Sequence, residues 1–524
     1  MLRWMLDRGR LVFACACALS PAQAATTLAP AFHIESNQPS ARFGSDVASA
    51  GDVNGDGYED VIVGAMFYAD GEASEGAAFI FHGGPDGLAA ATLADADTVL
   101  QSNQAMARFG GAVASAGDVN GDGYDDVIVG AGGWESAGQA ADFEEGGAFV
   151  FLGGPDGVAS GGPEAAVAIL EGDFAATRLG SSVSTAGDIN GDGYDDVVAG
   201  GYLYQSTGEE SREGVAMIFL GGPDGIASAG FATAHAVLQS NQSDGFLGNA
   251  VAGPGDLDGD GYDDVVVGAP RFNAPDEREG AVFVFYGSEN GIEDGGPTTA
   301  GTQLEGDQID ARFGTSVAAA GDVNGDGFPD IVVGAPRYDA ALIDVGAAFV
   351  FLGGPGGIAS GGPGVAAAQL EGDQTGTTSN TCEGNFGCSV AGGDWDGDGF
   401  SDVVVGSPYQ DSGQVDEGLA FLFRGGPDGI ASAIAGAADQ RFEANSRGSL
   451  LGWSSSLADV DGDGDADAMI GAWSFGDPPP TSFPPALGHE REGAVFGFTF
   501  VPEPTALAAA LVAIATLVCQ SRRR

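Results

Sequence analysis

A nine-residue stretch rich in Asp and Gly occurs seven times along this chain at nearly equal intervals. The first copy occupies residues 52–60 and reads DVNGDGYED. The other six copies begin at Asp118, Asp188, Asp256, Asp322, Asp394 and Asp459, so successive starts are 66, 70, 68, 66, 72 and 65 residues apart. A fixed period of this kind indicates a repeat architecture with one structural unit per copy.

The spacing of oxygen-bearing side chains within each copy predicts a calcium-binding loop. Oxygens stand at positions 1, 3, 5 and 9, and Gly at position 6 permits a sharp turn. Calcium takes six to eight oxygen ligands, and position 7 would add its backbone carbonyl. The predicted Ca²⁺ ligands are Asp52, Asn54, Asp56, Tyr58 and Asp60; Asp118, Asn120, Asp122, Tyr124 and Asp126; Asp188, Asn190, Asp192, Tyr194 and Asp196; Asp256, Asp258, Asp260, Tyr262 and Asp264; Asp322, Asn324, Asp326, Phe328 and Asp330; Asp394, Asp396, Asp398, Phe400 and Asp402; and Asp459, Asp461, Asp463, Asp465 and Asp467.

Two other loop types are weighed against this interpretation. An EF-hand needs a bidentate Glu at position 12, but position 12 is apolar in every copy and lies in a β-branched run such as Val61-Ile62-Val63. The loop therefore precedes a strand. A metal-free hairpin turn explains one isolated Asn-Gly-Asp-Gly, but it does not require the carboxylate kept at position 9. We expect the metal to be structural.

The repeats predict an all-β fold, a seven-bladed β-propeller with calcium-binding loops. The second repeat offers four strands, at residues 98–101, 112–116, 126–130 and 147–152, and the last two are continuously apolar. Such strands are buried on both faces, as in a radial stack of four-stranded sheets. The first outer strand, residues 31–35, lacks a partner of its own, and the last repeat stops at residues 494–500. We therefore expect the N-terminal strand to close the ring.

Charge and histidine count exclude two classes of function. The net charge is −57 and all 18 basic residues are Arg, whereas nucleic-acid binding needs a basic surface. The four histidines, at positions 33, 82, 235 and 489, share no local cluster, so neither a zinc site nor a His-based triad is predicted.

Motifs on either side of the calcium loops resemble those of a known family. Phe43-Gly44 precedes the first calcium loop, and Gly334-Ala335-Pro336 follows the fifth. These motifs are similar to the FG-GAP repeat of the integrin α-subunit propeller. The resemblance covers residues 31–500, although Leu179 and Leu247 replace the Phe of the first motif. It implies a calcium-binding propeller, without implying an integrin-like heterodimer.

The two ends of the chain predict export. Residues 1–24 have the basic start, apolar stretch and Ala-Gln-Ala site of a secretory signal. Residues 501–524 contain Pro502-Glu503-Pro504, an apolar run at 505–519 and three terminal arginines. This tail resembles a PEP-CTERM sorting segment, which implies processing by an exosortase in a Gram-negative bacterium; a plain membrane anchor is the alternative. Membrane contact is expected only through this tail.

Cysteines and aromatics give further expectations. Cys382 and Cys388 are expected to form a local disulfide in a secreted chain, with two free thiols as the alternative. The loop between the third and fourth strands of each sequence repeat, which in the second repeat lies between strands 126–130 and 147–152, carries an aromatic residue. These loops are expected on the face opposite the calcium loops. These rings could stack on sugars or pack within the propeller. Trp134 and Tyr204 are the candidate ligand residues, because their loops break the repeat pattern.

The sequence therefore predicts a secreted or cell-surface binding and adhesion module whose partner is an extracellular polysaccharide or a surface protein. A purely structural surface protein is the first alternative. A polysaccharide hydrolase is the second, but it needs a pair of carboxylates on the ring axis and the sequence assigns none. We expect no enzymatic activity.

Overall fold

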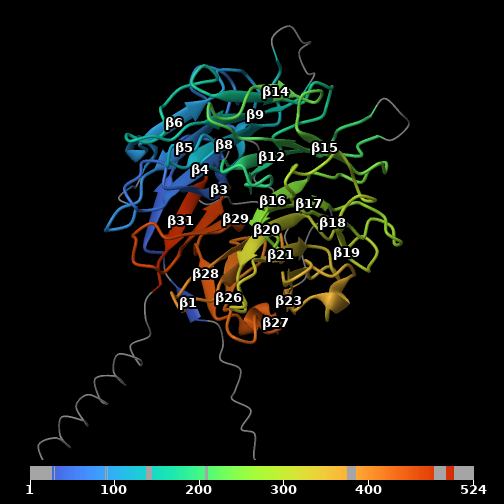
Figure 1. Cartoon of the computed structure of the whole chain (residues 1–524). Helices are drawn as coiled ribbons and strands as arrows, with labels where there is room; N and C mark the ends of the chain where they lie inside the picture. The colour runs from blue at the N-terminus through green and yellow to red at the C-terminus, as the bar shows by residue number, and fades with distance from the viewer. Residues whose placement is uncertain are drawn as a thin grey trace, which may run out of the picture.

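A computed structural model describes residues 26–28, 30–88, 90, 92–136, 144–206, 211–374, 385–476 and 491–500. Seven antiparallel sheets stand side by side around a central channel (Figure 1). The predicted all-β, seven-bladed propeller is confirmed. The predicted signal and sorting segments, residues 1–24 and 501–524, lie outside the described residues, as do His489 and Cys382.

Each blade contains four strands, ordered from the channel outward. Blade 1 consists of β3 (Phe43–Gly51), β4 (Asp60–Ala65), β5 (Ala77–Phe81) and β6 (Thr98–Gln101). Blade 2 consists of β7 (Phe109–Gly117), β8 (Asp126–Ala131), β9 (Gly147–Phe151) and β10 (Ala168–Glu171). Blade 3 consists of β11 (Ser182–Gly187), β12 (Asp196–Gly201), β13 (Val215–Phe219) and β15 (Ala236–Gln239). Blade 4 consists of β16 (Ala250–Gly255), β17 (Asp264–Ala269), β18 (Ala281–Phe285) and β19 (Thr302–Glu305).

The remaining blades follow the same order. Blade 5 consists of β20 (Ser316–Gly321), β21 (Asp330–Ala335), β22 (Ala347–Phe351) and β23 (Ala368–Glu371). Blade 6 consists of β24 (Val390–Gly393), β25 (Asp402–Ser407), β26 (Leu419–Phe423) and β28 (Gln440–Glu443). Blade 7 consists of β29 (Leu451–Ala458), β30 (Asp467–Ala472), β31 (Ala494–Phe498) and β2 (Phe32–Glu35). Short additions are β1 (Thr26–Leu28), β14 (Ala229–Gly230) and β27 (Ala433–Ile434), with 3₁₀ turns η1 (Leu93–Asp95), η2 (Pro363–Val365) and η3 (Ala435–Ala437).

The N-terminal strand closes the ring, as the sequence predicted. Strand β2 pairs antiparallel with β31, and Phe32 lies opposite Gly497. The first and last parts of the chain thus complete one sheet, which removes an open edge. Strand β1 was not predicted; it adds to the outer edge of blade 6 by pairing parallel with β28.

The core lies between the blades. Every residue of the second strand and of the third strand in each blade is buried, as in β4 and β5. Their continuous apolar runs are buried because both faces of each sheet contact neighbouring sheets. Blades approach closely where glycines meet: a Cβ on Gly64 would lie 2.0 Å from the carbonyl oxygen of Gly110. The glycines of the two FG-GAP motifs therefore permit this contact between blades.

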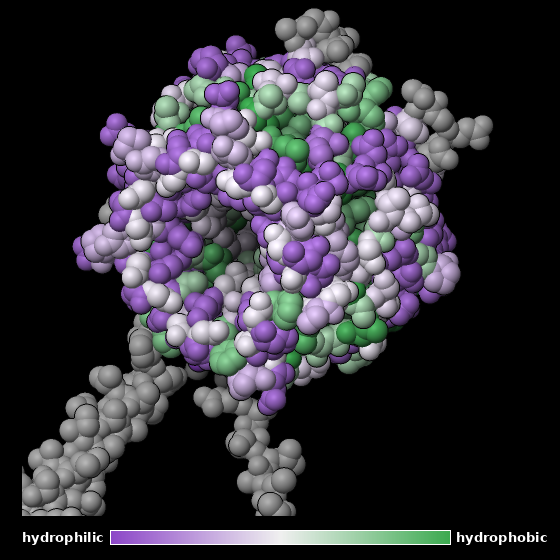
Figure 2. Space-filling view, in the orientation of Figure 1, coloured by the Kyte–Doolittle hydropathy of each residue, from purple (hydrophilic) through white to green (hydrophobic). Residues whose placement is uncertain are grey.

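The antiparallel strands give the propeller two faces. The Asp-rich loops join the first and second strands of each blade, and we call the face that carries them the loop face. The loops between the second and third strands, and those that enter the next blade, lie on the opposite face. The surface in Figure 2 is mostly hydrophilic and is hollowed near its centre.

Candidate metal centres and the opposite face

The first residue of each Asp-rich loop organises the turn. In the first loop, Oδ1 of Asp52 accepts hydrogen bonds from the N–H groups of Gly55 (2.7 Å) and Asp56 (3.0 Å). Its Oδ2 accepts one from Gly57 (2.8 Å). The other six loops repeat the bond from position 5, as Asp322 and Asp326 show. The loop thus holds its carboxylates on one side of a tight backbone turn.

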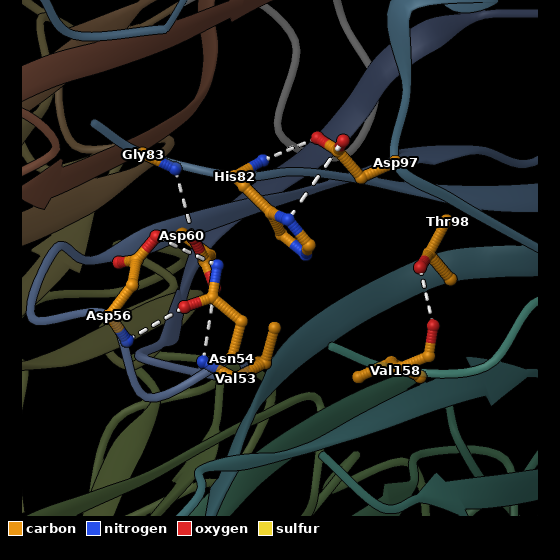
Figure 3. A network of polar contacts seen from close by, with 9 residues as sticks. All are labelled: Val53, Asn54, Asp56, Asp60, His82, Gly83, Asp97, Thr98 and Val158. Atoms are coloured by element: carbon orange, nitrogen blue, oxygen red, sulfur yellow. Dashed lines mark hydrogen bonds and ion pairs between the residues drawn. The ribbon is translucent and has the colours of Figure 1, made fainter. Parts of the chain in front are cut away.

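The side chains at positions 3 and 5 lie next to one another. In Figure 3, Asn54 donates from Nδ2 to Asp56 at 3.1 Å, and its Oδ1 accepts the N–H of Asp56 at 2.8 Å. In three loops that carry Asp at position 3, one carboxylate oxygen from each of three residues lies within 4.8 Å of the others. These groups are Asp256, Asp258 and Asp260; Asp394, Asp396 and Asp402; and Asp459, Asp461 and Asp463.

The position 9 carboxylate is buried in every loop and braces the turn against its blade. Asp60 accepts hydrogen bonds from the N–H of Val53 (3.0 Å) and, across the sheet, from that of Gly83 (2.9 Å), as Figure 3 shows. Burial, with smaller effects of neighbouring aspartates, raises the pKa of Asp126 to about 7 and that of Asp467 to about 8. The buried carboxylate therefore favours a positive partner.

The donor set fits a divalent cation. Oδ2 of Asp467 and Oδ1 of Asp396 are buried without a hydrogen-bond partner among the described residues. All side-chain donors are oxygens, which calcium prefers. An ion would be held by positions 1, 3, 5 and 9 and by the carbonyl of position 7. The sixth loop differs, since Arg424 forms an ion pair with Asp396.

The side chain at position 7 has a role that the sequence did not reveal. The ring of Tyr124 lies over Gly55 of the preceding loop, where a Cβ would be 2.7 Å from Cε1. The same contact joins Tyr194 to Gly121 and Phe400 to Gly325. The ring at position 7 therefore packs adjacent loops together, and Gly at position 4 gives it room.

Position 8 carries a second connection between loops that the sequence analysis missed. The N–H of Asp52 donates to Oδ2 of Asp125 in the next loop at 2.8 Å. Asp195 and Asp263 accept the same bond from Asp118 (2.8 Å) and Asp188 (2.9 Å). The sequence does carry a signal for this contact, because an Asp recurs at positions 125, 195 and 263. Position 8 is not among the predicted calcium ligand positions. The loop face is thus a connected belt.

Most of the aromatic residues on the opposite face pack inward. Five of them contact the Phe of the following strand edge-on, with centroids 5.0–5.3 Å apart, and these are Tyr68, Trp134, Phe272, Tyr338 and Phe475. Tyr204 is 4% exposed and stacks on Phe231 at 5.1 Å. The structure therefore favours packing for Tyr204, whose ring is not available as a stacking surface. Trp134 is partly buried, and its role in ligand binding stays a prediction.

Arginines gather on the opposite face. Of the twelve arginines between residues 42 and 491, ten lie in its loops: Arg42, Arg108, Arg178, Arg212, Arg271, Arg278, Arg312, Arg337, Arg447 and Arg491. Arg178 donates to the hydroxyl of Tyr202 at 3.2 Å and to Glu144 at 2.5 Å. A net charge of −57 did not predict this concentration of cations.

Three of these arginines lie over aromatic rings, and two of them, Arg42 and Arg271, come within 4.5 Å of a ring centroid. The guanidinium carbon of Arg42 is 4.0 Å from the ring centroid of Trp473, which stacks on Trp453 at 4.1 Å. Burial and nearby Arg491 lower the pKa of Arg42 to about 10. The guanidinium carbon of Arg271 is 4.4 Å from the centroid of Phe246. Within the described ranges, neither arginine forms an ion pair with a carboxylate.

A pocket of about 270 Å³ opens beside Arg271. Its lining includes Tyr202, Phe246, Arg312 and the polar side chains of Ser181, Asn249 and Thr315. Arg312 is 9% exposed and its Nε has no hydrogen-bond partner in the described part of the chain. Burial and nearby Arg337 lower the pKa of Arg312, and burial with Arg212 lowers that of Arg271. The pocket thus combines cations, rings and polar groups.

Cys388 is disulfide-bonded, which agrees with the expected oxidised state. Its expected partner, Cys382, lies outside the described residues. Among the helices that the structure describes, none has the length and apolar composition needed to cross a membrane.

Comparison with known families supports the repeat assignment. The FG-GAP repeat model matches residues 43–81, 109–141, 179–209, 248–285, 313–351 and 386–422. These six stretches contain the first six Asp-rich loops, and the seventh loop lies beyond them.

Several known proteins are similar to part of the chain. Integrin alpha-5 of Xenopus laevis is 34% identical over 177 residues, which are 33% of this chain and 16% of that protein. Integrin alpha-IIb of Homo sapiens is 33% identical over 238 residues, covering 44% and 20%. Phosphatidylinositol-glycan-specific phospholipase D of Bos taurus is 35% identical over 176 residues, covering 33% and 20%. The matched region thus spans a fifth or less of each relative.

Similarity to solved structures is weaker. The crystal structure of exotype rhamnogalacturonan lyase YesX aligns at a TM-score of 0.35 and 14% identity, covering 78% of this chain and 59% of the lyase. Similarity this low carries no information about function. The matched repeats and the seven blades together show that this chain is a seven-bladed β-propeller that contains FG-GAP repeats.

Proposed function

We propose that this propeller is a calcium-stabilised binding and adhesion module that holds an acidic polysaccharide on its opposite face. The observation that carries the proposal is the pocket beside Arg271 and Arg312. Both guanidinium groups lie among other arginines, and of the two only Arg312 has an ion-pair partner, Asp310, among the described residues. Cations placed together in this way are stabilised by an anionic ligand.

The chemistry of the pocket favours a carboxylated sugar. Guanidinium groups bind carboxylates through two parallel hydrogen bonds, and Arg271 already lies on an aromatic ring, where cation–π attraction holds it. Tyr202 is partly exposed and offers ring surface for a sugar, and its ring contacts that of buried Phe246 with centroids 5.6 Å apart. Ser181, Asn249 and Thr315 offer side-chain oxygens as acceptors for hydroxyl groups, while their own donors already bond to backbone carbonyls. An acidic surface protein is the competing partner.

Binding rather than catalysis is proposed for this site. Glycoside hydrolysis needs two carboxylic acids that flank the bond, whereas the lining of this pocket contains arginines and neutral polar groups. Secretion, tail processing by an exosortase and retention at the surface of a Gram-negative cell are also proposed, from the two terminal segments. N-terminal sequencing and intact mass of protein recovered from the culture medium would test both cleavages.

The binding test compares an acidic polymer with a neutral one. Polygalacturonate and dextran are titrated into calcium-loaded protein, and into the variants Arg271→Gln and Arg312→Gln. We expect saturable binding of polygalacturonate alone, which weakens about tenfold or more in either variant and with added salt, because each charge-assisted contact contributes about 1.5–3 kcal/mol. Arg441→Gln, on the outer strand β28, is the matched control and should bind normally.

Three outcomes would contradict the proposal. Equal binding by the arginine variants would place the ligand elsewhere. Failure to bind any acidic polymer, with capture of an acidic protein instead, would favour the competing partner. Release of shortened polygalacturonate would show an enzyme.

A further inference from the structure

One residue position on the opposite face carries an arginine in four of the seven blades. It is the residue directly before the Phe-Gly or Leu-Gly motif, where the chain enters the innermost strand of a blade. The arginines are Arg42, Arg108, Arg178 and Arg312, in blades 1, 2, 3 and 5. All four have a φ of 55–57°, so the repeat places one cation at the same site, on the same backbone conformation, in each of these blades.

Blade 4 has Phe246 at this position, but an arginine from another loop takes the place of the missing cation. The guanidinium carbon of Arg271, in the loop after β17, lies 4.4 Å from the centroid of the Phe246 ring. Asn385 and Leu450 stand at the same position in blades 6 and 7. Blades 1 to 5 therefore present an unbroken series of guanidinium groups, which we call the arginine arc: Arg42, Arg108, Arg178, Arg271 and Arg312.

Contacts link the first three members of the arginine arc. Burial and the charges of Arg491 and Arg108 lower the pKa of Arg42 to about 10, so Arg42 and Arg108 lie close enough to repel each other. Glu144 forms ion pairs with both Arg108, at 3.6 Å, and Arg178, at 2.5 Å. The arc is therefore continuous from blade 1 to blade 3.

Tyr202 continues the arc toward blades 4 and 5. Its hydroxyl accepts a hydrogen bond from Arg178 at 3.2 Å, and its ring lies 5.6 Å from the ring of Phe246, on which Arg271 rests. Burial and the charges of Arg337 and Arg271 lower the pKa of Arg312, so the last two members also lie close together.

Two adjoining pockets lie along the arc. The pocket of about 270 Å³ described above holds its last two members. A second pocket, of about 190 Å³, is lined by Arg108, Arg178 and three glycines. Tyr202 and Ser181 line both pockets, so these two residues stand between them. Each pocket thus offers two guanidinium groups beside a shared tyrosine ring.

The arc has fewer acids than cations. Within the described ranges, only Glu144 and Asp310 form ion pairs with its five arginines. Glu144 is shared by two members of the arc, and Asp310 is also held by Arg278 at 3.7 Å and Arg337 at 2.6 Å. Cations brought together without matching acids are stabilised by an anionic ligand.

We infer that the arginine arc is one continuous track for a single polyuronate chain, with the two pockets as consecutive subsites. The inference rests on the proposed function and extends it from one pocket to five blades. A polymer with a carboxylate on each sugar can meet successive guanidinium groups, each through a charge-assisted hydrogen bond. Because the linked contacts form in one binding event, the affinity should rise much faster than the number of sugars.

The dependence of affinity on chain length tests the inference without any variant. Galacturonate and its oligomers of increasing defined length are titrated into the full-length, calcium-loaded protein. We expect the affinity for a long oligomer to exceed that for galacturonate by about a hundredfold or more. Binding at a single pocket would raise the affinity only in proportion to length, because a longer chain offers more equivalent registers.

Variants then locate the track. Arg108→Gln removes a cation of the arc that lies outside the pocket beside Arg271. It should lower the ratio of long-oligomer to short-oligomer affinity about tenfold or more, because a charge-assisted contact is lost. Arg447→Gln is the matched control, since this arginine lies on the same face but between β28 and β29, off the arc, and the ratio should stay the same. The melting temperature of each variant checks that it is folded.

The outcomes separate this inference from the proposed function. Affinity that grows only in proportion to chain length in the unaltered protein would overturn the inference, and so would an unchanged ratio in folded Arg108→Gln. If Arg271→Gln still weakens binding in those cases, the single pocket stands and only the extended track is wrong. If no acidic oligomer binds at all, the proposed function is wrong together with the inference.

Discussion

The ring of Tyr58 lies against the backbone of Gly462, although the two residues belong to the first and last repeats. A Cβ on Gly462 would be 2.8 Å from Cε1 of Tyr58. The contact joins the first Asp-rich loop to the last and repeats the relation between Tyr124 and Gly55 in the adjacent loops. The loop face is therefore a closed belt, and this pair lies at the seam where the two ends of the ring meet.

We expect Gly462→Ala to destabilise the protein by about 1–3 kcal/mol, because the methyl group overpacks the contact and Gly462 has a φ of 71°. Tyr58→Ala removes the ring that the methyl group would strike. In a double-mutant cycle measured by urea denaturation, Gly462→Ala should cost less in the Tyr58→Ala background. Equal costs in both backgrounds would mean that the contact contributes nothing at the seam.

Calcium removal should lower the melting temperature. Three of the loops each bring three carboxylates within 4.8 Å of one another, and a bound ion stabilises the folded state by mass action. We expect EDTA to lower the midpoint of thermal unfolding of residues 25–500, and excess Ca²⁺ to restore it. Excess Mg²⁺ serves as the control and should restore less, since it dehydrates reluctantly. If EDTA leaves the midpoint of thermal unfolding unchanged, the prediction that the Asp-rich loops bind calcium is wrong.

The contact between adjacent loops through position 8 should be measurable in one blade. Asp195→Ala leaves the N–H of Asp118 without its acceptor, and loss of a partly buried acceptor costs about 1–3 kcal/mol. Denaturation of this variant should therefore show a clear loss of stability. Asp224→Ala, at an exposed turn position, should be close to neutral, and a similar loss in both variants would argue against the specific contact.

Asp46 should give stability a pH dependence of its own. Asp46 lines the central channel beside several Ser and Thr side chains. Its carboxylate accepts a hydrogen bond from the N–H of Val113 in the next blade at 2.9 Å. Burial raises its pKa to about 7, above an unfolded value of about 3.9. The folded state therefore binds the proton more tightly, so the contribution of Asp46 to stability is full below about pH 4 and is lost as pH rises to about 7.

The variant Asp46→Ser introduces the residue that Ser182, Ser316, Ser389 and Ser454 place at the same position in other blades. With calcium saturating, the stability of the unaltered protein relative to this variant should fall between about pH 4 and pH 7, by up to about 1.4 kcal/mol per pH unit. Parallel pH profiles for the two proteins would contradict the raised pKa.

The sequence determined every feature that one repeat specifies by itself. The Asp-rich loop, the apolar second and third strands and the N-terminal strand left over for blade 7 follow from spacing and burial, and the structure has the predicted blades and ring closure. Loop irregularity singles out Trp134 and Tyr204 but does not report the direction in which a ring points, and Tyr204 is buried against Phe231.

Tertiary structure decided which side chains of different repeats meet. Asp125 binds the loop of the preceding blade, Arg42 from the start of the chain lies on Trp473 near its end, and Glu279 meets Asp307 across two loops. A repeat period fixes the contacts of a strand with its own sheet. Contacts between blades depend instead on how the closed ring brings residues tens to hundreds of positions apart within a few ångströms, and no local pattern encodes that distance.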